Sequence, residues 1–398
     1  MRIINENENE DDLKTIIKTV NGNILNGGIL MRRLKAGIIG CGNISGVYLS
    51  NCTKHFKVLE IDAVADLVPE RARAKAAEYG VPRSLTVEEM LGDPQIEMII
   101  NLTLPAVHGD LCLRVLDAGK HVYVEKPLSI KREMGARVLE LARQKNLRIG
   151  GAPDTFLGGG LQTCRKLIDE GWIGRPVAAS AFMTGHGPEG WHPDPEFFYK
   201  EGAGPMLDMG PYYLTALVAL MGPVRRASGS AAVSFAERKA TSKEKYGTMI
   251  KVEVPTHVSA SLDFENGALA TLIISFDVWD SKLPRIEIYG SEGTMCLPDP
   301  NFFNGPVLIK RQDAQVWSEM PLTFGYTENM RGIGAADMAA AITGGRLHRA
   351  NGEMAFHVLD VMQGIIESSE QGSYYAPVST CSRPEALDAG FISEIGGI

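Results

Sequence analysis

The stretch LKAGIIGCGNISGVYLSNCTKHFKVLEIDAVAD, residues 34–66, decides the fold. It opens with the apolar run Leu34–Ile39, which predicts a buried strand. The glycine-containing loop 40–46 follows, then a helical pattern, then a second apolar run at 58–65 that Asp66 closes. A strand, a glycine loop that opens a helix, and a second strand ended by an acid form the context of a dinucleotide-binding fingerprint.

The small residues of this loop suit a phosphate-binding turn. Gly40 permits the tight turn, and Gly42 lets backbone N–H groups approach a pyrophosphate at the positive N-terminus of the following helix. The third position of the fingerprint is Ser45, which is small enough for close packing. Asn43 and Ile44 complete the loop. We therefore predict that the loop binds a dinucleotide; a tight structural turn is the alternative.

Asp66 indicates which dinucleotide is bound. It ends the second strand about 20 residues past the loop, where an acid holds the ribose 2′-hydroxyl. Its charge would repel a 2′-phosphate, so the sequence favours NAD over NADP. Arg71 and Arg73 lie close enough to leave NADP open.

From residue 34 to residue 151, short apolar runs alternate with helical patterns. The expected strands are 34–39, 58–65, 97–102, 121–125 and 147–149, and the expected helices are 43–51, 69–79, 107–118 and 131–145. Ser129 is the expected N-cap of the last helix. This alternation implies βαβ units and a parallel sheet. We predict an α/β Rossmann domain, a doubly wound parallel sheet, over residues 31–152.

After Asp154 the pattern changes to strands that follow one another without helices, which is typical of an antiparallel sheet. Asn266-Gly267, between two of these strands, is a strong hairpin signal. Helical patterns occur at 161–170, 208–221, 333–342 and 353–369. We predict that residues 153–398 form an α+β domain with a large open antiparallel sheet that binds substrate.

Residues 1–30 begin acidic and Asn-rich and carry no secretory-signal pattern. We expect a loose N-terminal extension, and Met31, which opens MRRLKAGIIG, looks like a natural start.

The composition excludes several classes of protein. The 398 residues are 44% hydrophobic, and 40 Lys and Arg against 48 Asp and Glu give a net charge of −8. There is no long basic run and no apolar run of about 18 residues, so we expect no binding to nucleic acid or membrane. The six cysteines are scattered without zinc spacing, which favours a reducing, cytoplasmic location and no metal site.

Two further motifs carry candidate chemistry. Residues 125–127 read Glu-Lys-Pro at the carboxyl end of an expected strand, where open α/β sheets bind ligands. Lys126 can be desolvated there, with a lowered pKa, or can stabilise a developing alkoxide. Residues 202–213 read GAGPMLDMGPYY and place Asp208 and Tyr212 four apart, on one helix face. Taken alone, the same residues also fit a surface lysine, a helix cap and a core tyrosine.

In this order and spacing the three motifs resemble the Gfo/Idh/MocA oxidoreductase family, from about residue 35 to the C-terminus. That family carries a G-x-G-x-x-[AGS] loop, an E-K-P and an aspartate in a D-x-G-x-H segment. The segment NLTLP at 101–105, with His108 just beyond, is similar to the family's loop after its fourth strand. GSEGT at 290–294 is similar to the family's hairpin in the second domain.

The resemblance implies a Rossmann domain that binds NAD(P) and an open antiparallel sheet whose front face covers the active site. It also implies oxidation or reduction at a carbon of a sugar, polyol or sugar derivative. Lys126 matches the family's catalytic lysine and Asp208 its aspartate. The further cofactor contacts that we expect are Asn101, Thr103, Pro105, His108 and Glu125.

The family's usual histidine falls at Tyr212, and two interpretations follow. In the first, Tyr212 handles the hydroxyl proton, and the Lys126 ammonium lowers its pKa from about 10 toward neutrality. In the second, Tyr212 only hydrogen-bonds substrate, and the base is Lys126 or a histidine. The loop HGPEGWHP at 186–193 offers His192, and Trp191 offers a stacking face for a pyranose. The remaining candidate substrate contacts are Tyr213 and Asp154.

The sequence thus predicts an NAD(P)-dependent dehydrogenase or reductase that acts on CH–OH groups. Because an open sheet leaves one face uncovered, we expect a homodimer or homotetramer. An NAD-dependent glycosidase of this fold and a dinucleotide-binding regulator without catalysis are the alternatives.

Overall fold

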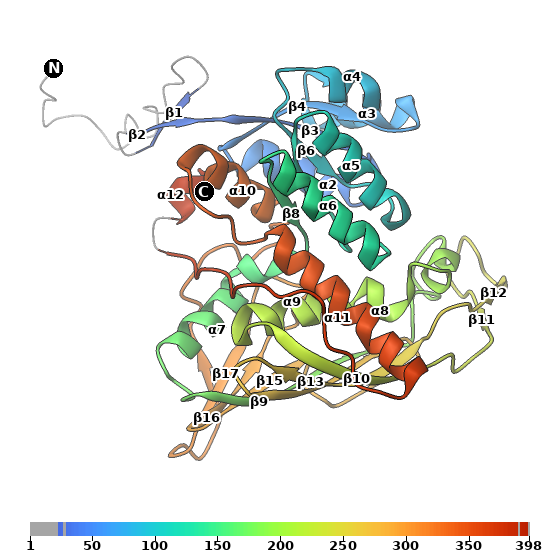
Figure 1. The fold of residues 1–398 in the computed structure, drawn as a ribbon, viewed down its shortest axis with the longest axis vertical. Coiled ribbons are helices and arrows are strands. Elements are labelled where there is room, and N and C mark those ends of the chain that lie inside the picture. The colour runs from blue at the N-terminus through green and yellow to red at the C-terminus, as the bar shows by residue number, and fades with distance from the viewer. Residues whose placement is uncertain (1–22, 27–28, 389–390, 397–398) are drawn as a thin grey trace, which may run out of the picture.

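The computed structural model describes residues 23–26, 29–388 and 391–396, and two sheets with helices packed on them make up most of it (Figure 1). The first sheet has six strands in the order β5-β4-β3-β6-β7-β8, and all neighbouring pairs are parallel. The strands are β3 (Leu34–Ile39), β4 (Leu59–Ala65), β5 (Arg83–Ser84), β6 (Met98–Asn101), β7 (His121–Val124) and β8 (Ile149–Gly151). The helices are α2 (Ser45–Lys54), α3 (Pro69–Tyr79), α4 (Val87–Gly92), α5 (His108–Asp117) and α6 (Arg132–Gln144).

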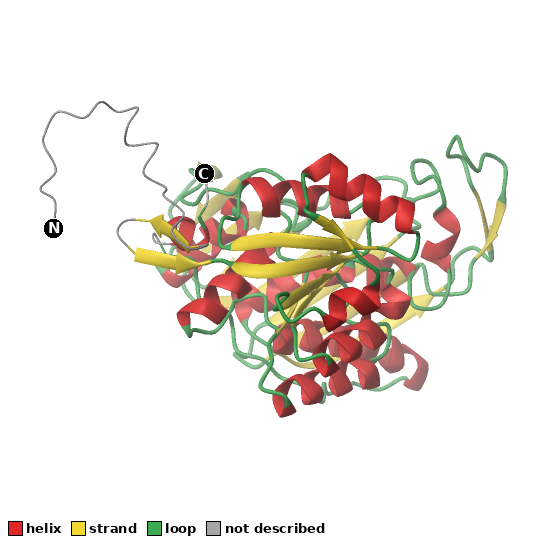
Figure 2. Cartoon of the chain, turned by 90° about the horizontal axis from the view of Figure 1, so that it is seen from above, coloured by secondary structure: helices red, strands yellow, loops and turns green. Residues whose placement is uncertain are grey.

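This arrangement confirms the predicted Rossmann domain. Strands β3, β4, β6 and β7 are almost wholly buried, as expected when helices cover both faces of a parallel sheet. Figure 2 shows helices on both sides of these strands. Strand β5 and helix α4, with two and six residues, are too short to be predicted from the sequence pattern.

The strand order reverses between β3 and β6. The chain builds outward from β3 to β4 and β5, then returns to β6 and continues on the other side to β7 and β8. Such a reversal opens a crevice at the carboxyl ends of the two strands, where doubly wound sheets bind ligands. Gly40 directly follows β3 and Asn101 ends β6, so both candidate residues lie at this edge.

The predicted cap of α6 is wrong. The helix begins at Arg132, and its N-cap residue is Lys131, whose side chain makes no capping bond. The Ser129 hydroxyl donates instead to the Lys131 carbonyl at 2.6 Å, which tightens the turn before the helix.

The second sheet has eight strands in the order β10-β13-β14-β9-β15-β16-β17-β18. These are β9 (Pro176–Thr184), β10 (Val224–Ala232), β13 (His257–Phe264), β14 (Leu269–Ser275), β15 (Ile286–Gly290), β16 (Gly293–Leu297), β17 (Val307–Arg311) and β18 (Ser318–Met320). A separate ribbon, β11 (Glu237–Lys239) with β12 (Met249–Lys251), projects at one side in both views (Figures 1 and 2). The helices α7 (Gly159–Asp169), α8 (Gly204–Asp208), α9 (Gly210–Met221) and α11 (Gly352–Gln371) pack on one face of the sheet.

The expectation of a purely antiparallel sheet needs correction, because β14 pairs with β9 in parallel. The connection from β9 to β10 runs through α8 and α9. Because this helical crossover brings the chain back to the edge of the sheet where β9 begins, β10 runs in the same direction as β9. Two hairpin steps, β10 to β13 and β13 to β14, then restore the same direction beside β9. The Asn266-Gly267 hairpin joins β13 and β14 as predicted.

The C-terminal segment returns to the first domain. Helix α10 (Ile333–Gly344) contacts β8, and α11 contacts α6 and β8. Helix α12 (Phe391–Ile395) accepts a hydrogen bond at its Ile395 carbonyl from the Val58 amide beside β4. The domain that the sequence analysis begins at residue 153 therefore also buttresses the Rossmann sheet.

At the other end of the chain, residues 1–22 of the expected extension lie outside the described residues. Strands β1 (Asn23–Asn26) and β2 (Ile29–Arg32) form an antiparallel pair. The expected boundary at residue 31 therefore falls inside β2. In the described part of the chain, no helix is both long and apolar enough to cross a bilayer.

Candidate active site

The loop after β3 is shaped to receive a phosphate group. Gly40 has a φ of +103°, and a Cβ there would lie 2.5 Å from the Leu102 carbonyl oxygen, so only glycine fits. Gly42 is different, because a Cβ on it would meet no atom within 4 Å. Gly42 and Asn43 are exposed, Ile44 is half-buried, and no side chain caps the first turn of α2. Open space in front of an uncapped helix N-terminus fits a pyrophosphate.

Asp66 supports this loop from the end of β4. One carboxylate oxygen accepts the Cys41 amide at 2.8 Å, and the other accepts the Val68 amide at 2.8 Å. Each oxygen keeps a lone pair, so the carboxylate can also accept a ribose hydroxyl, as the sequence predicts. Arg71 and Arg73 are both exposed on α3, and Arg73 pairs with Glu70.

Two of the predicted cofactor contacts, Asn101 and His108, make hydrogen bonds that fix the segment after β6. Asn101 is buried; its Oδ1 accepts the Thr103 hydroxyl at 2.6 Å, and its Nδ2 donates to the His108 carbonyl at 3.3 Å. The buried His108 ring lies 2.7 Å from the Pro127 carbonyl and 2.9 Å from the Thr103 carbonyl. Both side chains are thus engaged by the chain itself. They shape the loop whose half-exposed residues, Thr103 and Pro105, remain candidates for cofactor contact.

The Glu-Lys-Pro motif places a fixed cation at the end of β7. Buried Glu125 accepts the Tyr48 hydroxyl from α2 at 2.8 Å and the Lys126 amide at 2.9 Å. The Lys126 Nζ lies 2.7 Å from the Asp208 Oδ1 and 2.7 Å from the Asp208 carbonyl oxygen. Burial by itself lowers the pKa of Lys126, but the negative charges around it, Asp208 foremost, raise it above its usual value. The expectation of a lowered pKa is therefore wrong, and Lys126 remains an ammonium ion.

Tyr212 lies beside this pair. Asp208 ends α8 and Tyr212 belongs to the first turn of α9. The prediction that one helix face presents both residues is therefore wrong, since they lie on successive helices. The Lys126 Nζ is 5.3 Å from the centre of the Tyr212 ring, and the Arg331 guanidinium is 5.9 Å from the same centre. Burial raises the pKa of Tyr212 more than these two cations lower it. The expected shift toward neutrality is therefore wrong, and the phenol keeps its proton at neutral pH.

Two cavities meet at Asp208. One, of about 420 Å³, is lined by Lys126, His192, Phe197 and Asp208 among others. The second, of about 330 Å³, is lined by Trp191, Tyr213, the Arg285–Asp299 ion pair and Asp208 among others. The structure thus brings four sequence-predicted residues, Lys126, Trp191, His192 and Tyr213, around the predicted aspartate.

These substrate candidates differ in how they reach the cavities. Trp191 is 69% exposed and free to stack on a ring, and half-buried His192 accepts the Asp194 amide at 3.0 Å. Tyr213 is buried, and its hydroxyl has no hydrogen-bond partner among the described residues.

Asp154 does not line either cavity. It is only 1% exposed, and its Oδ2 accepts the amides of Gly332 and Gly334 at 2.8 and 3.0 Å. Its role as a substrate contact needs correction: it is a buried carboxylate that fixes the start of α10. The neighbouring glycines 158–160 permit close approach to other chain segments, since a Cβ on Gly160 would overlap the Asn304 carbonyl.

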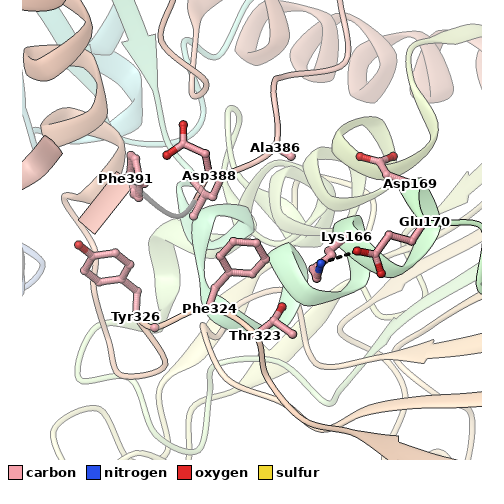
Figure 3. Close-up of a pocket in the computed structure, with 11 residues that line it drawn as sticks. Lys166, Asp169, Glu170, Thr323, Phe324, Tyr326, Ala386, Asp388 and Phe391 are labelled. Carbon is pink, nitrogen blue, oxygen red and sulfur yellow. Dashed lines mark hydrogen bonds and ion pairs between the residues drawn. The ribbon is translucent and has the colours of Figure 1, made fainter. Parts of the chain in front are cut away.

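A cavity of about 590 Å³ lies elsewhere, between α7, residues 323–326 and the C-terminal segment (Figure 3). Its lining includes Lys166, which pairs with Glu170, and the rings of Phe324, Tyr326 and Phe391. It shares no residue with the two cavities at Asp208. This cavity is therefore separate from the candidate catalytic residues.

Comparison with known proteins agrees with this geometry. Residues 34–151 match a family model described as an oxidoreductase family with an NAD-binding Rossmann fold, and residues 161–296 match the GFO/IDH/MocA C-terminal domain. The chain belongs to the Gfo/Idh/MocA family. As a member it is an NAD-binding oxidoreductase, as the resemblance implied.

Two relatives of this Gfo/Idh/MocA protein are named for the sugar or inositol on which they act. It is 25% identical over 320 residues to 1,5-anhydro-D-fructose reductase of Ensifer adhaerens, covering 79% of this chain and 90% of the relative. It is 31% identical over 153 residues to inositol 2-dehydrogenase of Salmonella typhimurium, covering 36% of this chain and 44% of the relative. The solved structure of levoglucosan dehydrogenase with NADH and levoglucosan shares the fold, with a TM-score of 0.74, 19% identity and coverage of 87% and 100%.

Two residues of the site were not predicted from the sequence, because neither belongs to a family motif. Tyr48, on the apolar face of α2, holds Glu125, and Arg331, in the segment before α10, faces Tyr212. For Arg331 the available signal was its position: a charged residue directly before the apolar helix Ile333–Gly344.

Proposed function

We propose that this protein is an NAD(P)-dependent dehydrogenase or reductase of a sugar, polyol or sugar derivative. The observation that carries the proposal is the Lys126 ammonium, fixed 2.7 Å from the Asp208 carboxylate at the wall of a cavity and beside the Tyr212 ring. The names of the relatives, a reductase of anhydrofructose and dehydrogenases of inositol, support this class of substrate.

The roles of the residues follow from their charges. The bound nicotinamide supplies or accepts a hydride. Lys126 donates a hydrogen bond to the reacting oxygen and stabilises the negative charge that develops on it. Asp208 keeps the ammonium in place and accepts a hydrogen bond from a neighbouring substrate hydroxyl. Tyr212 exchanges the proton with the reacting oxygen.

The proton balance favours reduction near neutral pH. A phenol whose pKa is raised by burial starts the cycle protonated, and can give its proton to a carbonyl oxygen while the carbonyl carbon receives the hydride. In the oxidative direction Tyr212 must first be ionised, which alkaline pH favours.

A substrate screen tests this proposal. Anhydroketoses, keto-inositols and ketoses are offered with NADH and NADPH, and the matching alcohols with NAD and NADP, while the absorbance of reduced cofactor is followed. We expect turnover with at least one pair, and loss of it in Lys126→Met, which keeps the length of the side chain but not its charge. Hydrolysis of a glycoside without net change in cofactor would contradict the proposal and indicate the glycosidase alternative.

We further propose that the chain forms a homodimer or homotetramer through the uncovered face of the eight-stranded sheet. Side chains that point to this face include half-exposed Ile273 and exposed Leu269 and Thr271 on β14, bordered by Ser259 and Ser261 on β13. A flat surface of small and apolar side chains suits packing against a second copy. Light scattering at micromolar concentration tests this, and a strictly monomeric mass would contradict it.

A cytoplasmic location completes the proposal. All six cysteines are free thiols, which agrees with a reducing compartment.

A further inference from the structure

Arg331 is held rigidly beside the proposed acid. Its guanidinium donates to the Asn301 side-chain and main-chain oxygens at 2.6 and 3.1 Å and to the Asn329 Oδ1 at 2.8 Å. Its own carbonyl and that of Asn329 accept hydrogen bonds from the Asn51 side chain of α2 at 2.9 and 2.8 Å. The backbone is thus anchored to the helix that follows the dinucleotide loop, and the side chain reaches toward the second domain.

The guanidinium lies between two aromatic rings. Its centre is 5.9 Å from the Tyr212 ring and 5.9 Å from the Phe303 ring, and it also interacts with the Tyr212 hydroxyl. Arginine favours such positions because its flat cation packs against ring faces.

The charge of Arg331 is not neutralised by a close carboxylate. Among the described residues Arg331 makes no ion pair; its hydrogen-bond acceptors are neutral oxygens of Asn301 and Asn329. The carboxylates of Asp154 and Glu125 act on it only at longer range. Burial lowers the pKa of Arg331, but Tyr212 and these two carboxylates raise it above its usual value, so the guanidinium stays charged. This charge can stabilise a negative charge that forms on the neighbouring Tyr212 oxygen.

We propose that Arg331 is the positioning residue of Tyr212: its guanidinium orients the phenol and stabilises the phenolate that remains after proton transfer. This rests on the proposed function, in which Tyr212 is the acid. During reduction the Tyr212 O–H bond breaks and a new O–H bond forms on the substrate oxygen, as the carbonyl carbon receives a hydride from the reduced nicotinamide. The electron pair stays on the phenolate oxygen, between Lys126 and Arg331, until solvent returns a proton.

This arrangement gives a physical reason for a tyrosine at the position where the family has a histidine. An imidazole that protonates near pH 6.5 needs no second cation, whereas a buried phenolate does. Because Asn51 ties Arg331 to α2, the orientation of Tyr212 also depends on the cofactor domain.

The first test needs no substrate. NMR of protein labelled at tyrosine Cζ follows the ionisation of Tyr212, whose signal is identified by its absence in Tyr212→Phe. We expect Arg331→Gln to move the Tyr212 midpoint upward by about one unit or more, and Arg331→Lys to restore most of the difference. An unchanged midpoint in Arg331→Gln would overturn the proposal.

The second test measures kcat with the reducible substrate found by the screen. Arg331→Gln should lower kcat by roughly tenfold to a hundredfold in the native background, but by less than about threefold in Tyr212→Phe, because the two residues act on one proton. The Kd of the cofactor and the melting temperature should stay unchanged. Equal losses of kcat in both backgrounds would indicate a structural role and overturn the proposal. Weakened cofactor binding together with an unchanged Tyr212 titration midpoint would overturn it as well.

The two tests separate the proposals. If Tyr212→Phe keeps its activity, Tyr212 is not the acid and the proposed function loses that assignment. The NMR titration still reports independently whether Arg331 acts on the phenol. If Arg331→Gln does not fold, Arg331→Met, which keeps the apolar stem of the side chain and removes the charge, carries both measurements.

Discussion

The cofactor side and the substrate side of the active site use different chemical groups: backbone amides on the first and charged side chains on the second. The phosphate-binding part of the cofactor side is one continuous stretch, residues 34–66, in which buried apolar strands present a loop that works through backbone amides. The substrate side is assembled from segments far apart in the chain and works through charged side chains. Lys126 meets Asp208 there, and Arg238 joins Glu189 and Asp277 under the loop that carries Trp191.

This difference indicates where the protein can change. A site made of backbone amides depends on glycines and on strand geometry, so few replacements are tolerated. A site made of side chains on loops can be altered one residue at a time without rebuilding the sheet beneath it.

The largest effect should come from the substrate side, with Tyr212→Phe. This variant removes the transferable proton and little volume, so kcat should fall by roughly 10²–10⁴-fold while the cofactor Kd holds. Since burial raises the pKa of Tyr212, the oxidative kcat of the native enzyme should also climb with pH throughout the alkaline range, as phenolate accumulates.

Steady-state kinetics of two variants separates Tyr212 from its rival, His192. If His192 were the base, His192→Asn would show the large loss of kcat, and Tyr212→Phe would mainly raise KM. A Tyr212→Phe enzyme within about threefold of native kcat would contradict the assignment.

The buried charges under the substrate loop give the second effect. Arg238 is 5% exposed; it pairs with Glu189, donates to Asp277 at 2.7 Å and donates to the Phe276 carbonyl at 3.0 Å. Arg238→Met leaves two buried carboxylates without their counter-ion, so it should cost about 3–5 kcal/mol of unfolding free energy. Denaturant unfolding measures this.

Arg143→Met is the matched control. Arg143 is 75% exposed and pairs with Glu140 on the surface of α6, so its loss should cost less than about 1 kcal/mol. Similar losses in the two variants would show that the buried network does not hold the loop.

The Rossmann fold of the cofactor side could be predicted from the sequence because its signal is local: Gly40, Gly42 and Asp66 stand at fixed offsets between two apolar runs. Arg331 could not be found in this way, since only the folded chain brings it to Tyr212. The same limit explains the errors on charge: the pKa directions of Lys126 and Tyr212 depend on burial, which a motif does not reveal.

The third effect belongs to the cofactor side. Gly42→Val places a side chain in the open space before the loop, where it meets no atom of the protein, so folding should be unchanged. NAD binding should weaken by roughly a hundredfold or more, because the side chain occupies the pyrophosphate position. Calorimetry with NAD and a thermal melt measure both.

Gly40→Ala provides the contrast. Its Cβ would press against the Leu102 carbonyl in a backbone conformation that favours glycine, so here stability should fall as well. If Gly42→Val binds NAD normally, the open space is not the pyrophosphate site.

The fourth effect concerns Asp154, which lies between the two sides. Burial raises the pKa of Asp154 to about 6, above its unfolded value of about 3.9. The native state therefore binds this proton more tightly than the unfolded state does. The resulting stability is fully present below about pH 4 and is lost as the pH rises through about 6, a change of roughly 2–3 kcal/mol. Asp154→Asn keeps an acceptor for the Gly332 and Gly334 amides and should remove this part of the pH dependence. Denaturant unfolding of both proteins between pH 4 and pH 8 measures it, and identical curves would contradict the assignment.

The smallest effect should come from Asp66→Ala, and it tests how far the cofactor side depends on one charge. Asp66 accepts the Cys41 and Val68 amides, so both lose an acceptor; water can replace it at exposed Val68, whereas Cys41 is buried. For NAD the change removes a charged hydrogen bond to the ribose, worth about 1.5–3 kcal/mol, whereas for NADP it also removes a repulsion. The ratio of the two Kd values should therefore move toward NADP by roughly tenfold or more, with Arg71 available to the added phosphate. Calorimetry with both cofactors measures the ratio, and Glu70→Ala, on the same exposed edge, controls for a general change of surface charge. A ratio that moves toward NAD would show that Asp66 only shapes the loop.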